Sequence, residues 1–437
     1  MAPAFPARDS ILLLPPPPQP PSFQSLRATY ETSLKSVLRS VNSPSRTSTL
    51  DIALPLPFLY GASRTPRSVL YRQTQDAVAG LYKLIVVAAA QEGVDINPDV
   101  DGDGEGQGGV DVRILLVAEP RRTGPRDQGG WFGEVGVVVE LETLARSGRR
   151  WEVVWGVDGE DGETILRRFV EKRRELSRFA VRRVGGGIVQ VASTGEAEAP
   201  RVGLGERRKH YASVVGGTFD HIHIGHKLLL TMTAFMVDEL DTDQQTERSV
   251  TIGITNDALL ANKKYAELLQ SWDARRVAVE RFLIGIMDYR PTSPASLLSE
   301  SPSDLHVQHI NQPGPNGHAW NVTLVAPTHA AQPAGDITLK LVEIGDPFGP
   351  TITEPGVSVL VISAETRSGG AAVNQKRREK GWADMEVLEV DVLDSGEVED
   401  DGRHKDASGR DMRASFEGKL SSTEIRKERA TRGRSKV

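Results

Sequence analysis

The sequence predicts an α/β protein, with a Rossmann-like parallel sheet in its C-terminal half and a smaller α/β domain before it. Two observations indicate this fold class. After residue 210, short apolar strands alternate with helical segments, which is typical of a parallel sheet with right-handed crossovers. Residues 50–192 also alternate between strand and helix patterns, and the Gly- and Pro-containing residues 193–209 form a predicted linker.

Length and composition limit the possible functions. The chain has 437 residues, enough for two domains and a tail, and carries a net charge of −6. It contains no cysteine, which excludes disulfides, thiolate metal sites and cysteine nucleophiles. The net charge does not indicate a nucleic-acid partner. No apolar run reaches the roughly 20 residues that span a bilayer, so the sequence does not indicate a membrane partner. We therefore expect a soluble, cytoplasmic protein.

Residues 1–49 are predicted to be a disordered Pro/Ser-rich segment. They contain the proline run Pro15 to Pro18, and Asp9 and Glu31 are the only acids among the first fifty residues. Such a composition does not favour a buried core. A mitochondrial transit peptide shares the acid-poor bias, but the prolines interrupt the amphipathic helix that it needs, so a mitochondrial location is the alternative.

Residues 50–192 are predicted to form an accessory α/β domain of unknown role. Its expected elements are a helix over 68–90, strands over 110–118, 135–141 and 151–155, and a helix over 163–179. The run Asp99 to Glu105 resembles the start of an EF-hand loop, but the twelfth position is Val110, where calcium binding requires a bidentate Glu. We interpret this run as a solvated loop.

The second half is predicted to form a second domain over residues 210–437, with a basic tail. Its expected elements are a strand to Gly217, a helix to about Leu240, strands over 249–254, 357–362 and 386–392, and helices over 272–288, from 363 to 380 and from 421 onward. Two insertions, 291–318 and 395–416, are rich in Pro, Ser, Gly and charge and are expected to be surface loops.

The second domain is organised around the stretch from Val214 to His226. It is predicted to form a strand end, a glycine turn at Gly216 and Gly217, and a helix start. A helix N-terminus presents free N–H groups and the positive end of its dipole, which suits a phosphate. His223 and His226 add hydrogen-bond donors that can stabilise negative charge as it develops on phosphate oxygens.

Other chemistries fit this stretch less well. The chain has no G-x-x-x-x-G-K-[ST] run, and Gly203-Leu-Gly205 does not continue to a third glycine, so P-loop and dinucleotide-binding motifs are missing. His221, His223 and His226 could bind zinc, but only Asp220 supplies a further candidate ligand nearby. Simple helix capping by these histidines is the remaining alternative.

The stretch Gly216-Gly-Thr-Phe-Asp-His-Ile-His-Ile-Gly-His226 resembles the T/HxGH signature of the nucleotidyltransferases. It is most similar to the eukaryotic and archaeal type of phosphopantetheine adenylyltransferase, and further blocks agree in order. These are Thr255 to Tyr265, Gly345 to Pro350, Ser363 to Thr366 with Gly369 to Asn374, and Leu420 to Arg426. The resemblance covers roughly residues 210–430 and none of the N-terminal half.

The resemblance implies transfer of the adenylyl group of ATP to 4′-phosphopantetheine, giving dephospho-coenzyme A and pyrophosphate. It implies that Thr218 orients the acceptor phosphate, that His223 and His226 contact the ATP phosphates, and that Lys263 neutralises developing charge. Lys264 is the alternative to Lys263, because the sequence does not settle which side chain points inward. The nucleotide-binding residues that it implies are Gly216, Gly217, Phe219, Gly225, Glu365, Ser421, Ser422, Thr423 and Arg426.

The run from Ser421 to Thr423 begins a second predicted helix. Its hydroxyls and free amides are suited to the β and γ phosphates, with Arg426 as a fixed cation, whereas an ordinary N-cap would look the same in isolation. Thr366 and Asn374 resemble family positions near the nucleotide. Asp220 is expected to brace the turn, because the acceptor phosphate needs no deprotonation.

Magnesium is implied as the companion of ATP, and no protein ligand for a metal is predicted. We expect phosphates and water to hold the ion. Because no P-loop is present, we expect a separate dephospho-coenzyme A kinase to act on the product. The alternatives are a related transferase acting on FMN, nicotinamide mononucleotide or choline phosphate, and a binding protein with a degenerate transferase domain.

Overall fold

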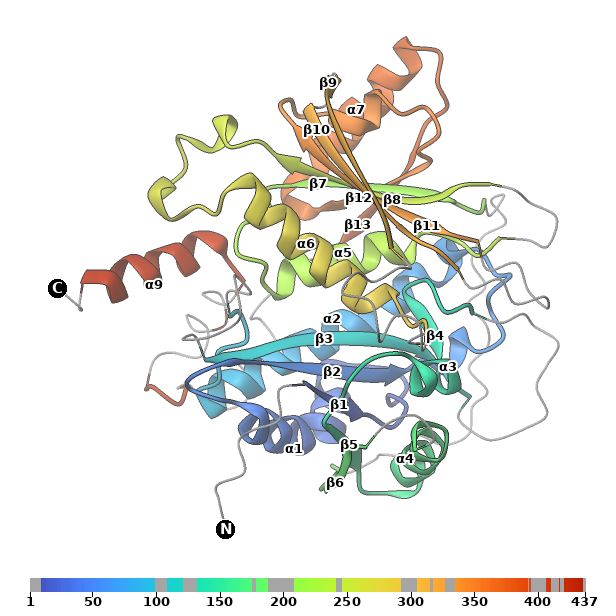
Figure 1. Cartoon of the computed structure of the whole chain (residues 1–437), viewed down its shortest axis with the longest axis vertical. Coiled ribbons are helices and arrows are strands. Elements are labelled where there is room, and N and C mark those ends of the chain that lie inside the picture. Colours follow the sequence, from blue (N-terminus) through green and yellow to red (C-terminus); the bar gives the residue numbers. More distant parts are fainter. Residues whose placement is uncertain are drawn as a thin grey trace. The chain divides into compact units, whose positions relative to one another are not determined.

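The computed structural model divides the chain into two compact units (Figure 1). Unit 1 comprises Met1–Trp131, Val138–Arg208 and Leu393–Lys419, and unit 2 comprises Phe132–Val137, Lys209–Val392 and Leu420–Val437. The structure describes residues 9–98, 108–120, 132–174, 178–187, 208–240, 246–291, 305–314, 317–326, 335–391, 393, 406–409, 416 and 420–434. Each unit therefore contains a segment from the other half of the sequence. Whether either unit folds alone stays a prediction.

Unit 1 is built on a six-stranded sheet in the order β4-β3-β2-β1-β5-β6, and every neighbouring pair is parallel. The strands are β1 (Asp9–Leu13), β2 (Thr47–Pro55), β3 (Gly109–Ala118), β4 (Val138–Glu140), β5 (Val153–Val157) and β6 (Ala180–Val184). The helices are α1 (Phe23–Val41), α2 (Arg67–Glu92), α3 (Leu141–Arg146) and α4 (Glu160–Arg173). This confirms an α/β domain before the second one.

The predicted disorder of residues 1–49 is wrong for residues 9–49. β1 lies between β2 and β5, and Ile11, Leu12 and Leu13 are fully buried. The helix α1 begins after the N-cap Ser22, whose Oγ accepts a hydrogen bond from the Ser25 N–H at 3.2 Å. Average composition concealed these elements, because the prolines lie in the connection between β1 and α1 and interrupt neither.

Most other predictions for unit 1 hold within a few residues. The helix over 68–90 is confirmed as α2 and the strand over 110–118 as β3. The strand expected over 135–141 is shorter, since β4 covers Val138–Glu140 and Val135 instead forms an antiparallel bridge with Asp288 of unit 2. The acidic run 99–105 lies outside the described residues.

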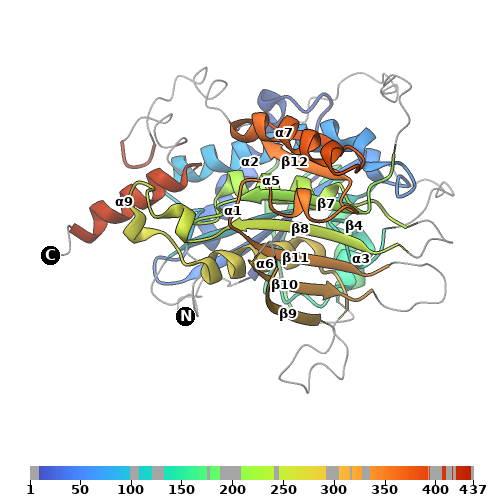
Figure 2. The ribbon, with the colours of Figure 1, turned by 90° about the horizontal axis from the view of Figure 1, so that it is seen from above.

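Unit 2 is built on a seven-stranded sheet in the order β13-β12-β7-β8-β11-β10-β9, which Figure 2 shows from above. The strands are β7 (Ala212–Gly217), β8 (Arg248–Thr255), β9 (Leu305–Gly314), β10 (Gly317–Leu324), β11 (Ile337–Ile344), β12 (Val359–Ser363) and β13 (Glu386–Val390). From β13 to β11 all pairs are parallel, and β10 and β9 extend the edge as an antiparallel hairpin.

The insertion 291–318 corrects one prediction. Its residues from 305 onward form β9 and the start of β10, where a surface loop was expected. Strand β11 was not predicted either, because it lies in the long stretch between the second and third expected core strands. The insertion 395–416 lies almost wholly outside the described residues.

The helices of unit 2 are α5 (Ile224–Phe235), α6 (Trp272–Met287), α7 (Arg367–Glu379) and α9 (Ser422–Arg434). The helix α5 ends five residues before the expected Leu240. α5 and α6 lie on one face of the sheet and α7 on the other (Figure 1), as right-handed crossovers require when the chain runs outward from β7 in one direction and from β12 in the other. The order therefore reverses between β7 and β12. In such sheets, ligands bind at this switch point, outside the carboxyl ends of the strands.

The apolar core of unit 2 joins β7, β12 and α7. Its buried members include Val214, Val357, Leu360, Ile362, Val373 and Met385. Within the described part of the chain, no helix is both long enough and apolar enough to cross a membrane.

Candidate active site at the glycine turn

The turn after β7 has a strained backbone. β7 ends at Gly217 and α5 begins at Ile224, and between them Phe219 and His221 have φ angles of 52° and 45°. Residues other than glycine rarely adopt positive φ, and such strain persists only where the surroundings hold it. This turn is therefore a rigid element at the carboxyl end of the sheet.

Two glycines at the ends of the turn, Gly217 in β7 and Gly225 in α5, lie close to aromatic rings. A Cβ atom at Gly225 would lie 3.2 Å from the ring of His223, and one at Gly217 would lie 3.0 Å from the ring of Phe219. Phe219 is itself fully buried, with its ring centroid 5.4 Å from that of His226. Phe219 and Gly225 thus pack against the two histidines, and their predicted contact with the nucleotide stays a prediction.

His223 and His226 are held as a stacked pair. Their ring centroids lie 3.8 Å apart and their planes are inclined by 21°. His223 is the N-cap of α5, and its Nδ1 accepts a hydrogen bond from the His226 N–H at 3.4 Å. An accepting Nδ1 places the proton of the neutral ring on Nε2. The sequence predicted these two histidines, and the structure brings them together.

Both rings are neutral at physiological pH. The pKa of His223 lies well below its ordinary value, because burial disfavours the charged form and because His226, Lys227 and His221 lie nearby. The pKa of His226 is lowered to about 3 by burial, then by His221 and Lys263. Neutral imidazoles at a helix N-terminus can donate to an arriving phosphate without repelling one another.

His221 is turned away from this pair. Its Nε2 lies 3.0 Å from the Leu268 carbonyl oxygen, and its backbone N–H donates to the Gln270 Oε1 at 2.8 Å. It therefore fastens the turn to the segment before α6. Across the described residues, no group of three or more His, Cys, Asp or Glu side chains is arranged to hold a metal ion.

The lysine segment after β8 approaches the turn. The Nζ of Lys263 lies 3.5 Å from the Thr218 Oγ1, and Lys263 is exposed. Lys264 instead contributes its carbonyl oxygen to Arg426, at 3.2 Å from Nε. The geometry thus favours Lys263 over Lys264 as the cation beside Thr218.

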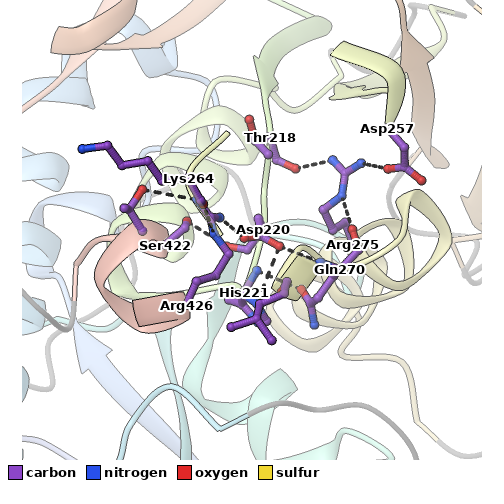
Figure 3. Close-up of polar contacts among 11 residues, drawn as sticks. Thr218, Asp220, His221, Asp257, Lys264, Gln270, Arg275, Ser422 and Arg426 are labelled. Atoms are coloured by element: carbon purple, nitrogen blue, oxygen red, sulfur yellow. Dashed lines mark hydrogen bonds and ion pairs between the residues drawn. The ribbon is translucent and has the colours of Figure 1, made fainter. Parts of the chain in front are cut away.

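Arg275 on α6 joins three parts of the site and was not among the residues predicted from the sequence (Figure 3). Its fully buried guanidinium donates to the Thr218 carbonyl oxygen at 2.7 Å, to the Gln270 carbonyl oxygen at 3.0 Å and to the Asp257 Oδ1 at 2.6 Å. Charged residues on amphipathic helices usually face solvent, so its spacing on α6 carried no signal. Asp257 lies inside the family block after β8, which was the only available pointer.

The N-terminus of α9 supplies the last predicted segment. The Ser421 Oγ accepts from the Glu424 N–H at 3.4 Å, and the Ser422 Oγ donates to the Asp220 carbonyl oxygen at 2.9 Å. Arg426 is only 2% exposed, and its guanidinium pairs with the Asp220 carboxylate. The segment therefore lies beside the turn, as predicted, but Arg426 faces Asp220 and not the solvent side where a phosphate would bind.

The remaining predicted residues follow β12. Glu365 lies in the 3₁₀ turn η5 (Ala364–Thr366), at the carboxyl end of the strand next to β7. Thr366 donates through Oγ1 to the Ser363 carbonyl oxygen. Asn374 exchanges two hydrogen bonds with the Met385 backbone, at 3.0 and 2.9 Å. Its amide thus fastens α7 to the chain before β13, a structural role.

Comparison with known proteins finds relatives over about half of the chain. Over 232 residues the chain is 32% identical to a Saccharomyces cerevisiae protein named phosphopantetheine adenylyltransferase, covering 53% of this chain and 52% of that protein. It is 24% identical over 189 residues to a Thermococcus kodakarensis protein of the same name, covering 43% of this chain and 79% of that protein. An uncharacterized protein of Schizosaccharomyces pombe is 29% identical over 189 residues, covering 43% of this chain and 42% of that protein.

The N-terminal half matches a different family. Residues 1–190 match a family described as "Domain of unknown function (DUF8446)". The chain thus spans about half the length of its yeast relative, and the matched family of its N-terminal part carries no functional description.

The sheet carries the HxGH turn at its switch point, an arrangement that resembles the nucleotidyltransferases. The chain is similar over about half of its length to proteins named phosphopantetheine adenylyltransferase.

Proposed function

We propose that this chain transfers the adenylyl group of ATP to the phosphate of 4′-phosphopantetheine. An oxygen of the acceptor phosphate attacks the α-phosphorus of ATP, the new P–O bond forms, and the bond to the β-phosphate oxygen breaks. The products are dephospho-coenzyme A and pyrophosphate. The attacking oxygen is already an anion, so the protein has to align two polyanions and stabilise charge at the α-phosphorus.

The contact between Lys263 and Thr218 is the observation that carries the proposal. It joins the glycine turn to a block 45 residues further along the chain, with the cation and the hydroxyl 3.5 Å apart. The resemblance assigns the hydroxyl to the acceptor phosphate and the lysine to the developing charge. A lysine placed between donor and acceptor is what in-line transfer between two phosphates requires.

The histidine pair supports the donor side of the same reaction. The Nε2–H of His223 and the ring of His226 stand at the N-terminus of α5, where backbone N–H groups and the helix dipole favour anions. The start of α9 adds the Ser421 to Thr423 hydroxyls as candidate ligands of the β and γ phosphates. The role of Gly216 and Gly217 as nucleotide contacts rests on the resemblance, since a Cβ atom at Gly217 would meet the Phe219 ring at 3.0 Å.

Magnesium would bind together with ATP, and we do not expect protein side chains to be its main ligands. Two carboxylates of the site, Asp220 in the turn and Asp257 after β8, are paired with Arg426 and Arg275. We therefore expect ATP phosphates and water to supply the ligands, and the ion to offset phosphate charge as pyrophosphate leaves. Phosphorylation of the product by a separate dephospho-coenzyme A kinase remains a prediction.

An acceptor panel tests the proposal. Purified protein is incubated with ATP and Mg²⁺ together with 4′-phosphopantetheine, FMN, nicotinamide mononucleotide or choline phosphate, while pyrophosphate release is followed. We expect release with 4′-phosphopantetheine alone. Turnover with another acceptor in its place would select a different transferase of the class, and release with none would indicate a degenerate transferase domain.

A further inference from the structure

Arg426 lies at the meeting point of three segments that are far apart in the sequence. Its Nη1 pairs with the Asp220 carboxylate, its Nε donates to the Lys264 carbonyl oxygen at 3.2 Å, and its Nη2 donates to the Thr423 Oγ1 at 3.3 Å (Figure 3). One guanidinium thus touches the glycine turn, the lysine segment and α9. These are the three segments that are proposed to surround the ATP phosphates.

Asp220 completes the connection from the other side. It is 1% exposed, its Oδ1 accepts from the Gln270 N–H at 3.0 Å, and its backbone carbonyl oxygen accepts from the Ser422 Oγ at 2.9 Å. Two independent bonds, one from Arg426 and one from Ser422, therefore fasten the start of α9 to the turn. The same turn carries Thr218 two residues before Asp220 and His223 three residues after it.

Because Asp220 and Arg426 are buried, the stability of their ion pair depends on its geometry. A buried carboxylate and guanidinium lose their hydration, and only close pairing with further hydrogen bonds offsets that cost. The planar guanidinium presents donors in fixed directions, so it sets both distance and angle between the groups that it joins. A lysine in the same place would supply the charge without those directions.

We infer that Asp220 and Arg426 are positioning residues, whose buried pair sets the spacing between the phosphate-facing starts of α5 and α9 and the Lys263 segment. This inference rests on the proposed function for the identity of the ligand, ATP. In this arrangement Arg426 acts on the phosphates through the segments that it holds, without touching them. Sequence resemblance alone assigned it to the phosphates directly.

The two roles predict opposite effects when the Asp220 charge is removed. If Arg426 were a phosphate ligand, Asp220 would compete with ATP for the guanidinium, and Asp220→Asn would tighten ATP binding. If the pair positions the site, Asp220→Asn loosens α9 and weakens ATP binding. The sign of the change in the dissociation constant therefore separates the two roles.

The experiment measures ATP binding to the full chain by isothermal titration calorimetry for the wild type, Asp220→Asn, Arg426→Lys, Arg426→Gln and the Asp220→Asn/Arg426→Gln double variant. We expect each single variant to bind ATP about ten- to a hundred-fold more weakly, the range that loss of a charged hydrogen bond gives. The double variant should be no worse than the weaker single variant, because both changes break one unit. Tighter binding by Asp220→Asn, or unchanged binding by Arg426→Lys, would overturn the inference.

Hydrogen exchange supplies a readout that a general loss of stability does not reproduce. In Asp220→Asn, amides of residues 422–434 and 263–270 should exchange faster, while those of β7 and β8 keep the wild-type rate. Ser422→Ala removes only the bond to the Asp220 carbonyl oxygen and keeps both charges, so it is the milder variant if Asp220→Asn does not fold. Uniform acceleration in both variants, or none in α9, would contradict a positioning role.

The same data distinguish failure of the inference from failure of the proposed function. If the wild type binds ATP but does not adenylylate 4′-phosphopantetheine, the proposed acceptor is wrong. The binding and exchange data then still test the positioning role of Asp220 and Arg426. If the wild type turns over 4′-phosphopantetheine and Asp220→Asn has a lower KM for ATP, the proposed function stands and the positioning role of Asp220 and Arg426 is wrong.

Discussion

The imidazole rings of His223 and His226 are stacked with their centroids 3.8 Å apart, directly at the start of α5. Two imidazolium rings at this distance would repel one another, and burial lowers the pKa of both. The two rings are therefore neutral at physiological pH. Charge stabilisation at the α-phosphorus is the task that this arrangement suits.

Replacing His226 by alanine should lower the rate of pyrophosphate release by about 10²–10³-fold, the range measured for removing one preorganised donor. The matched control is His318→Ala, an exposed histidine on β10, which should leave turnover unchanged. A folded His226→Ala protein that keeps more than half of the wild-type rate would remove His226 from the mechanism.

The depressed histidine pKa values predict a defined pH dependence of stability. An unfolded histidine binds a proton below about pH 6.5, whereas folded His226 does so only below about 3, so the unfolded state binds more protons between these values. The free energy of unfolding should therefore fall as the pH is lowered through this window.

Urea unfolding between pH 7 and 4 measures this effect against a matched variant. His226→Gln should lose less stability than the wild type over this range, because one of the histidines that must deprotonate on folding is gone. Parallel curves for the two proteins would show that His226 titrates normally in the folded state.

The two adjacent lysines should differ in their effects. Lys263→Ala removes the cation beside Thr218 and should reduce kcat by about 10²-fold or more, as loss of a transition-state contact does. Lys264→Ala keeps the carbonyl oxygen that Arg426 binds, so its effect should be within a few-fold. Steady-state rates for both variants decide this, and a larger loss in Lys264→Ala would reverse the assignment.

Arg275 should matter for stability as well as for turnover. Its replacement by methionine breaks bonds to the Thr218 carbonyl oxygen, Gln270 and Asp257, at a cost of about 1.5–3 kcal/mol for charged hydrogen bonds. The control is Arg367→Gln, because solvent screens the exposed pair of Arg367 with Glu389 and its loss should change stability little. Equal melting temperatures of the two variants would contradict the role of Arg275 in holding the turn.

The division of unit 2 predicts the behaviour of a fragment. A chain beginning at residue 209 lacks Phe132–Val137, whose Gly136 N–H donates to the Met287 carbonyl oxygen at 2.9 Å and whose Glu134 carbonyl oxygen accepts from the Tyr289 N–H at 2.8 Å. We expect this fragment to melt at a lower temperature than unit 2 of the full chain, and a peptide of residues 130–140 to restore part of the loss. A fragment that is indifferent to the peptide would show that the segment contributes nothing.

Sequence patterns predicted β7, β8, β12 and β13 because each is a short apolar run bounded by turn residues. They did not predict β11 or the β9–β10 hairpin, which lie in a long stretch of mixed composition. They also missed β1 and α1, because a proline run lowers the average over a segment whose flanks are apolar and periodic. Local pattern, and not mean composition, determines such elements.

The residues of the candidate site also differ in whether the sequence pointed to them. Sequence singled out His223 and His226 from the helix start and Thr218 and Lys263 from the family resemblance, and the structure brings these residues together in two pairs. The positions of Arg275 and Arg426 were not predictable, because Arg275 bonds the Thr218 carbonyl oxygen 57 residues away and Arg426 bonds Asp220 206 residues away. Whether an arginine faces a ligand or a buried carboxylate is decided by packing, which sequence spacing does not specify.

Isotope transfer tests the central claim most directly. ATP labelled at the α-phosphate or at the γ-phosphate is incubated with the protein, Mg²⁺ and 4′-phosphopantetheine, and the products are separated. We predict that the α label appears in dephospho-coenzyme A and the γ label in pyrophosphate, and that both signals fall together in His226→Ala. Transfer of the γ label to 4′-phosphopantetheine, or no transfer of the α label to it by folded wild-type protein, would contradict adenylyl transfer to this acceptor.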